Sequence, residues 1–318
     1  MNPRPLALLA GAGLLLLGAV PASAQAPDGP VAGAAGYKLK AGIATQKVRY
    51  YAPGQEVVLR GRVRPAVRGE VLTLYAIRGK KASKKVRRKV RRGGRFEFRF
   101  KVGNPGGVRL VIKHRASPAQ RAFRTRSRPI EVVDWQAGAG EHGLKVLLLQ
   151  RALIREGFAT PVTGYYDDGT ARGVLAFRKT NGLGRDGYAL REVFAMLMRG
   201  QGAYRLRYPR AGKHVEFDWS RQVLVLARGG RPYRTYHTSS GAPATPTVFG
   251  SYRFYLQTPG TNSHGMVHSS YFIGGYAIHG YASVPSYPAS HGCLRVPIPN
   301  ALSIFNWIDV GDPIFTYR

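Results

Sequence analysis

The stretch Ser290-His291-Gly292-Cys293-Leu294-Arg295 contains the only cysteine among 318 residues. A single thiol cannot close an intramolecular disulfide or build a Cys-rich zinc site, so both common structural uses of cysteine are excluded. A thiol becomes a strong nucleophile only when a neighbouring base removes its proton. His291 lies two residues upstream and His279 fourteen residues upstream. The stretch therefore predicts a nucleophilic cysteine, with a buried and inert cysteine as the alternative.

Ordered blocks of sequence around Cys293 resemble the L,D-transpeptidase catalytic domain, also called the YkuD domain. The resemblance extends from about Lys213 to Arg318, and its blocks are Tyr236–Gly241, Thr245–Gly250, Tyr271-Phe272, Ala277–Gly280 and Ser290–Arg295. The family usually places a glycine sooner after its Thr-Pro pair than this chain does, at Gly250. The match is specific because the blocks occur in the family's order.

The resemblance implies that Cys293 is the nucleophile and His279 the general base and then the general acid. No Asp or Glu lies between Asp218 and Asp309, so a Cys-His-Asp triad cannot be built locally. The partner that orients His279 is therefore expected to be a main-chain carbonyl or a hydroxyl. In the family it is the carbonyl of the residue after the base, which is Gly280 here.

Further site residues are expected around Cys293 and His279. The backbone N–H groups of Gly292 and Cys293 are expected to hold the oxyanion, with Tyr271 as a further donor. Ser290, His291 and Arg295 are expected to contact the substrate. For His291 the main expectation is that it shapes the loop, with a role as the base as the alternative. Arg295 could bind a substrate carboxylate or brace the loop.

The resemblance also implies a reaction. Cys293 would attack the amide between the third, diamino residue of a peptidoglycan stem and the D-Ala at position four, and a side-chain amine of a neighbouring stem would complete a 3→3 cross-link. Water as acceptor would make the protein an L,D-carboxypeptidase. Two alternatives are a wall-binding protein with an inactive catalytic domain and a polyanion-binding surface protein in which catalysis is secondary.

A metal site is a rival interpretation of the histidines. Five of the eight lie between His237 and His291, and histidine clusters often bind zinc. However, carboxylates are absent from this stretch, and His264 and His268 lack the intervening Glu of a helical zinc motif. We therefore expect no metal and no other cofactor.

Residues 1–24 read as a signal peptide. Arg4 precedes an apolar run from Leu6 to Val20, and Ala22-Ser23-Ala24 fits the small-x-small cleavage pattern. The run is short for a membrane span, so cleavage is expected and retention as an anchor is the alternative. No later segment is expected to cross a membrane. The mature protein is thus expected in the cell wall or periplasmic space.

Residues 25–36 are rich in Gly, Ala and Pro and predict a flexible linker. From 37 to 133 apolar and charged residues alternate, as in Arg95–Val102, which predicts an antiparallel β-sandwich resembling bacterial immunoglobulin-like modules. This segment carries 28 Lys and Arg against four acids. Such a field attracts polyanions. For an exported protein these are anionic wall polymers or lipid headgroups and not nucleic acid. The alternative is a solvated basic face without a specific partner.

The remaining chain predicts two further domains. Residues 140–200 show three short helical patterns that resemble a peptidoglycan-binding helical repeat, which implies peptidoglycan as a partner. Residues 204–318 are rich in Tyr, Val, Thr and Gly and predict a β-rich catalytic domain with one late helix near residues 300–308. The expected fold is therefore multidomain and mainly β.

Overall fold

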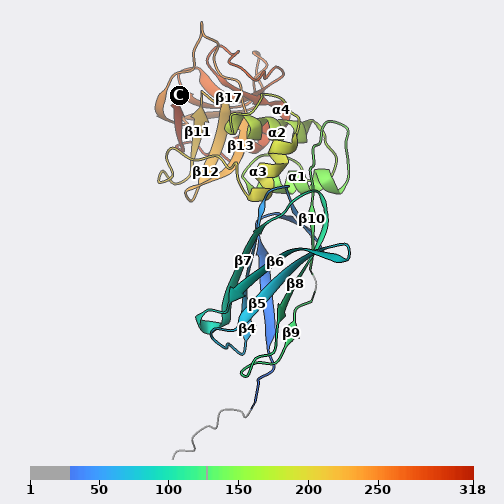
Figure 1. Cartoon of the computed structure of the whole chain (residues 1–318). Coiled ribbons are helices and arrows are strands. Elements are labelled where there is room, and N and C mark those ends of the chain that lie inside the picture. The colour runs from blue at the N-terminus through green and yellow to red at the C-terminus, as the bar shows by residue number, and fades with distance from the viewer. Residues whose placement is uncertain (1–28, 127) are drawn as a thin grey trace, which may run out of the picture.

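The computed structural model describes residues 29–126 and 128–318, so the predicted signal peptide lies outside the described residues. The chain forms three units, with a helical unit between a β-sandwich and a larger β-rich unit (Figure 1). The multidomain, mainly β architecture is thereby confirmed. In the part of the chain that is described, no helix is both long enough and apolar enough to cross a membrane.

The first unit is a sandwich of two sheets. One sheet is antiparallel and has the order β1 (Ala34–Lys40), β4 (Glu56–Arg64) and β7 (Arg95–Lys101). The other has the order β2 (Ile43–Ala44), β3 (Arg49–Tyr51), β10 (Arg128–Val132), β8 (Gly106–His114), β5 (Val71–Arg78) and β6 (Lys81–Lys89), with β9 (Phe123–Arg124) beside β8. One strand pair departs from the predicted antiparallel arrangement, because β10 pairs with β3 in parallel.

Alternation along each strand builds the core of this sandwich. In β7 the side chains of Phe96, Phe98 and Phe100 are buried, whereas Arg95 and Lys101 are exposed. The predicted linker was wrong at its end, because Ala34–Gly36 pair with β4 and so belong to the sandwich. The most basic run of the sandwich forms β6, an exposed edge strand paired with β5.

The helical unit contains α1 (Leu144–Arg155), α2 (Asp168–Thr180) and α3 (Arg191–Arg199), as predicted. The Asp167 side chain caps α2 by accepting a hydrogen bond from the Thr170 N–H. Gly200 ends α3 in the left-handed conformation, with φ of 68°. The apolar faces of the helices share one core, which also takes in Ile43 and Ala52 of the sandwich. The sandwich and the helical unit are therefore joined through a common core.

The C-terminal unit has two sheets and one helix. One sheet has the order β13 (Arg231–His237), β12 (Val223–Arg228), β11 (His214–Asp218), β19 (Pro313–Tyr317) and β14 (Gly250–Arg253). The other has the order β15 (Leu256–Thr261), β16 (Val267–Ile273), β17 (Tyr276–Tyr281) and β18 (Leu294–Pro297). The predicted late helix is α4 (Ile298–Phe305), which packs on β16 and β17.

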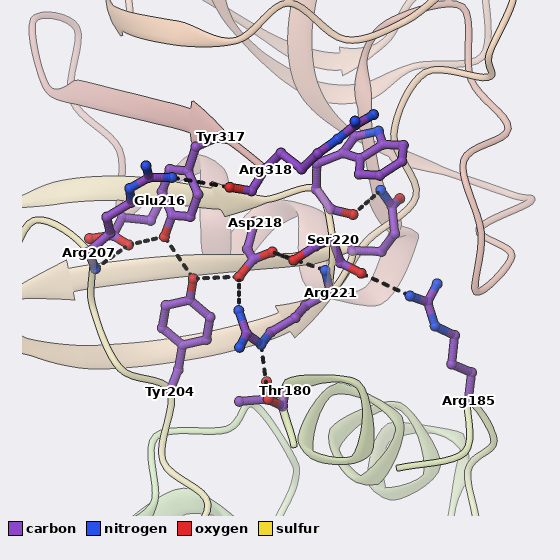
Figure 2. A network of polar contacts seen from close by, with 12 residues as sticks. Thr180, Arg185, Tyr204, Arg207, Glu216, Asp218, Ser220, Arg221, Tyr317 and Arg318 are labelled. Atoms are coloured by element: carbon purple, nitrogen blue, oxygen red, sulfur yellow. Dashed lines mark hydrogen bonds and ion pairs between the residues drawn. The ribbon is translucent and has the colours of Figure 1, made fainter. Parts of the chain in front are cut away.

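Two buried carboxylates on β11 organise the polar interior of this unit (Figure 2). Glu216 accepts hydrogen bonds from the backbone N–H groups of Arg207 and Tyr208 and from the Tyr317 hydroxyl. Asp218 accepts from the Ser220 hydroxyl and the Arg221 guanidinium, each at 2.6 Å. Burial alone would raise the pKa of both carboxyls. The hydrogen bonds outweigh it and hold both pKa values below the ordinary range.

These lowered pKa values predict that stability is lost in acid. A carboxyl whose pKa is lower in the folded than in the unfolded state stabilises the fold above about pH 4, and that contribution disappears as the pH falls further. We expect Asp218→Asn to lower stability at pH 7 by about 2 kcal/mol, because it leaves buried donors without a charged acceptor. Thermal unfolding followed from pH 7 to pH 3 measures both effects.

Asp168→Asn is the matched control, because Asp168 is exposed. It should unfold like the wild type at every pH. Equal pH profiles for the wild type and Asp218→Asn would contradict the assignment.

Candidate active site

Parallel pairing of β17 with β18 decides which side chains face one another. The register pairs Ile278 with Leu294 and His279 with Arg295. Ile278 and Leu294 are buried in the core, so His279 and Arg295 lie on the opposite face. Cys293 directly precedes β18 and is two residues from Arg295. Side chains two residues apart point the same way, so the thiol is brought to the face that carries His279.

A pocket of about 360 Å³ opens at this face. Five of the predicted site residues line it, namely Cys293, His279, Ser290, His291 and Arg295. Tyr271 is not among its lining residues and lies on β16 opposite Ala277, so the pocket gives no support to its expected role as an oxyanion donor.

Three further residues that line this pocket were not among the predicted site residues: His264, Met266 and Tyr281. Tyr281 could have been found, because it is two residues from His279 on one strand. His264 and Met266 lie between β15 and β16, more than 25 residues from Cys293. Nothing in the local pattern distinguishes them.

The His279 ring is held by its own strand. Its Nδ1 lies 2.9 Å from the Gly280 carbonyl oxygen, and because a carbonyl only accepts, Nδ1 carries the proton. The neutral ring therefore has its lone pair on Nε2. The ring is thus oriented by a main-chain carbonyl, and that carbonyl belongs to Gly280, as the resemblance implies. A Cβ at position 280 would lie 2.7 Å from the Ala301 Cβ, so glycine is required for α4 to pack here.

Burial shifts both reactive groups towards their neutral forms. It raises the pKa of the Cys293 thiol, an effect only partly offset by a backbone hydrogen bond from Ala277 and by the Arg295 charge. It also lowers the pKa of His279, with the bond to Gly280 acting in the opposite direction. At neutral pH the site therefore rests as a thiol beside a neutral imidazole.

The loop before Cys293 is held by its own hydrogen bonds. Ser290 is buried, its hydroxyl donates to the Cys293 carbonyl at 2.6 Å, and it accepts from the Gly292 N–H at 3.0 Å. Thr247 donates to the Gly292 carbonyl at 2.7 Å. Gly292 has φ of 115°, and a Cβ there would lie 2.2 Å from the Tyr276 ring.

These contacts change two expected roles. Ser290 braces the loop before Cys293, because its hydroxyl is already engaged within it. The Gly292 N–H is likewise engaged, because it donates to the Ser290 hydroxyl, and it could donate to an oxyanion only if that hydrogen bond were broken. The Cys293 N–H would not have to break this bond.

Arg295 and His291 present polar groups to the pocket. The Arg295 guanidinium lies over the Tyr281 ring, 4.2 Å from its centroid. Its ion-pair and hydrogen-bonding capacity is unused by any residue that the structure describes. His291 is exposed. Across residues 29–126 and 128–318, no group of three or more His, Cys, Asp or Glu is arranged to hold a metal ion.

The neutral resting pair predicts how the thiol reacts with a small electrophile. Iodoacetamide reacts with thiolate, so alkylation of Cys293 should rise with pH and gain most of its rate above about pH 8.5. Intact-mass spectrometry at several times and pH values gives the rate. A plateau already reached between pH 5 and pH 7 would indicate a preformed thiolate–imidazolium pair and contradict this prediction.

Two family models and several solved structures are similar to parts of this chain. Residues 212–315 match the model of the L,D-transpeptidase catalytic domain, and residues 142–197 match that of a putative peptidoglycan binding domain. An L,D-transpeptidase structure from Xylanimonas cellulosilytica is 33% identical, with a TM-score of 0.53; the match covers 58% of this chain and 98% of that one. One from Stackebrandtia nassauensis is 17% identical, with a TM-score of 0.37, and covers 57% and 95%. No curated protein matches the chain. The chain therefore belongs to the L,D-transpeptidase family.

Proposed function

We propose that the protein is an exported enzyme that forms 3→3 cross-links in peptidoglycan through a thioacyl intermediate on Cys293. The observation that carries the proposal is that one pair of strands brings Cys293 and His279 to the same pocket, with the imidazole Nε2 left free to take a proton. The peptidoglycan-binding domain supports a site of action in the wall or periplasmic space.

The first half of the reaction acylates the enzyme. His279 Nε2 takes the Cys293 proton as the sulfur attacks the carbonyl carbon of the third stem residue. A carbon–sulfur bond forms, and the carbonyl oxygen becomes an oxyanion that the Cys293 N–H stabilises. The carbon–nitrogen bond then breaks, and His279 returns the proton to the nitrogen of the departing D-Ala.

The second half transfers the acyl group. A side-chain amine of a neighbouring stem attacks the thioester while His279 accepts its proton. The new amide forms, and the thiolate leaves and is protonated. Water in place of the amine would give an L,D-carboxypeptidase with the same residues.

Arg295 is proposed to recognise a carboxylate of the stem. Its guanidinium faces the pocket over Tyr281, and no side-chain carboxylate lines that pocket. A planar guanidinium matches a carboxylate with two parallel hydrogen bonds. His291 is proposed to shape the entrance from its exposed position.

A carbapenem tests the nucleophile and the base, because the family accepts this class as a substrate mimic. Intact-mass spectrometry should show one adduct on the wild type and none on Cys293→Ala. His279→Ala should slow acylation by about two to four orders of magnitude, the usual effect of losing a positioned base. His291→Ala is the matched control and should slow it far less.

A greater loss in His291→Ala than in His279→Ala, with both variants folded, would exchange the two roles. A soluble tetrapeptide stem with a free side-chain amine tests the acceptor. A cross-linked dimer supports the transpeptidase, whereas tripeptide without dimer supports the carboxypeptidase.

A further inference from the structure

The outer face of the sheet β1–β4–β7 carries a concentration of positive charge. The register aligns Gly36, Arg62 and Arg95 in one row and Lys38, Arg60 and Glu97 in the next. Because Leu59 and Val63 are buried beneath, these rows face outward. Like charges in adjacent rows repel one another, so this face weakens the sheet unless a counter-charge binds.

This face is hollowed and not flat. A groove of about 1050 Å³ runs over β1, β4 and the turn before β7. Gly36 leaves space in it, since a Cβ there would have no neighbour within 4 Å. Seven cationic side chains line the groove against one carboxylate, Glu97, which is already paired with Arg60 at 2.6 Å. Among the described residues the other six have no ion-pair partner: Lys38, Arg62, Arg91, Arg92, Arg95 and Arg128.

The basic edge strand β6, which belongs to the other sheet, leads along the chain to the groove. β6 carries six Lys and Arg side chains from Lys81 to Lys89, all exposed, and the chain then passes directly to Arg91 and Arg92 at the groove. Nine strand residues extend about 30 Å. The six cations of β6, together with Arg91 and Arg92, form a basic track that is longer than a single small anion.

We propose that this groove and β6 bind a polyphosphodiester chain, the chemistry of an anionic wall polymer. Guanidinium groups match phosphate oxygens in pairs, and successive phosphates can occupy successive cations along the track. A concave groove encloses a chain, whereas a flat lipid surface meets convex protein surfaces. This site is separate from the Cys293 pocket and does not depend on the proposed reaction.

Poly(glycerol phosphate) is the probe. The full chain and the variant Arg62→Ser/Arg91→Ser/Arg92→Ser/Arg95→Ser are titrated with it over a salt series. We expect the variant to bind at least tenfold more weakly at low salt, and its slope of log Kd against log salt to fall by about three to four. A circular dichroism spectrum like that of the wild type shows that the variant is folded.

The matched control is Arg109→Ser/Lys113→Ser/Arg124→Ser/Arg126→Ser, which removes the same charge from another hollow of the same sandwich. It should weaken binding less than threefold. Equal losses in both variants would overturn the groove and show a diffuse field. Binding to vesicles of phosphatidylglycerol but not to the polymer would also overturn it.

A second observation concerns Lys179, on the helical unit. Its side chain is only 3% exposed, and its Nζ donates to the Thr238 carbonyl at 3.0 Å and to His237 Nδ1 at 2.8 Å. Since His237 Nδ1 accepts, Nε2 donates onward to the Val284 carbonyl at 2.8 Å. Burial, reinforced by the Arg185 charge, lowers the pKa of Lys179 to about 6.

Arg185, which follows α2, reaches the same segment. Its guanidinium donates to the Ser286 carbonyl at 2.6 Å and to the Ser220 carbonyl at 3.0 Å, the latter drawn in Figure 2. Val284 and Ser286 belong to residues 282–289, the link between the strand of His279 and the loop of Cys293. The helical unit therefore holds this link directly at the Ser286 carbonyl, through Arg185, and indirectly at the Val284 carbonyl, through Lys179 and then His237.

We infer that Lys179 and Arg185 are positioning residues, which set the geometry of the Cys293 loop from the peptidoglycan-binding unit. The inference rests on the proposed function, because it concerns the rate of acylation. A displacement of about 1 Å at a reacting group can cost a hundredfold in rate. Docking of the two units is then a condition for full activity.

Arg185→Gln tests this, because Arg185 is exposed and its loss should not unfold the protein. We expect the maximal carbapenem acylation rate to fall about tenfold, with the half-saturating concentration little changed, and amide hydrogen exchange in residues 282–289 to rise. Lys179→Met should do the same more strongly. Arg151→Gln, exposed on the same unit, is the control and should change neither measurement.

An unchanged rate in a folded Arg185→Gln variant would overturn the inference. Absence of any adduct on the wild type would instead overturn the proposed function, so the two failures are distinguishable.

Discussion

The parallel pairing of β17 with β18 is the constraint on which the catalytic site depends. It places His279 and Arg295 on one face and their neighbours Ile278 and Leu294 in the core. A slip of one residue would turn the reactive face inward. The twelve residues between the two strands must therefore end at one fixed register. Three side chains accordingly donate hydrogen bonds to backbone carbonyls of this connection, and they belong to Ser239, His237 and Arg185.

The lack of carboxylates in this region determines the electrostatics of the site. A carboxylate beside His279 would favour imidazolium, whereas the Gly280 carbonyl orients the ring and stabilises its charge only weakly. The thiol is also kept protonated by burial. Thiolate is the form that oxidises, so a resting thiol suits a free cysteine in an oxidising compartment. In the proposed reaction the thiolate would then form only as a substrate is attacked.

The sequence sufficed where the signal was local. Alternation of apolar and charged residues predicted the sandwich, and helical spacing predicted the three helices. The single cysteine in its Ser-His-Gly-Cys motif predicted the position of the pocket. It failed where contacts are long-range. Nothing near Ser290 shows that its hydroxyl is taken by Cys293 and Gly292, and nothing near Lys179 shows that it is buried against a strand 58 residues away. Such roles follow from the packing of distant segments and not from residue type.

The buried carboxylates of the C-terminal unit and the exposed cations of the sandwich have opposite effects on stability. Glu216 and Asp218 are buried, and each has several donors, so their charge stabilises the fold. The cations of the sandwich face outward with few acids near them, and their mutual repulsion opposes the compact state. A bound polyanion would relieve that repulsion and so stabilise the module by mass action. The excess positive charge therefore destabilises the free sandwich, and binding of a polymeric anion would offset that destabilisation. Anchoring to the polymer would also hold the Cys293 pocket near its proposed substrate.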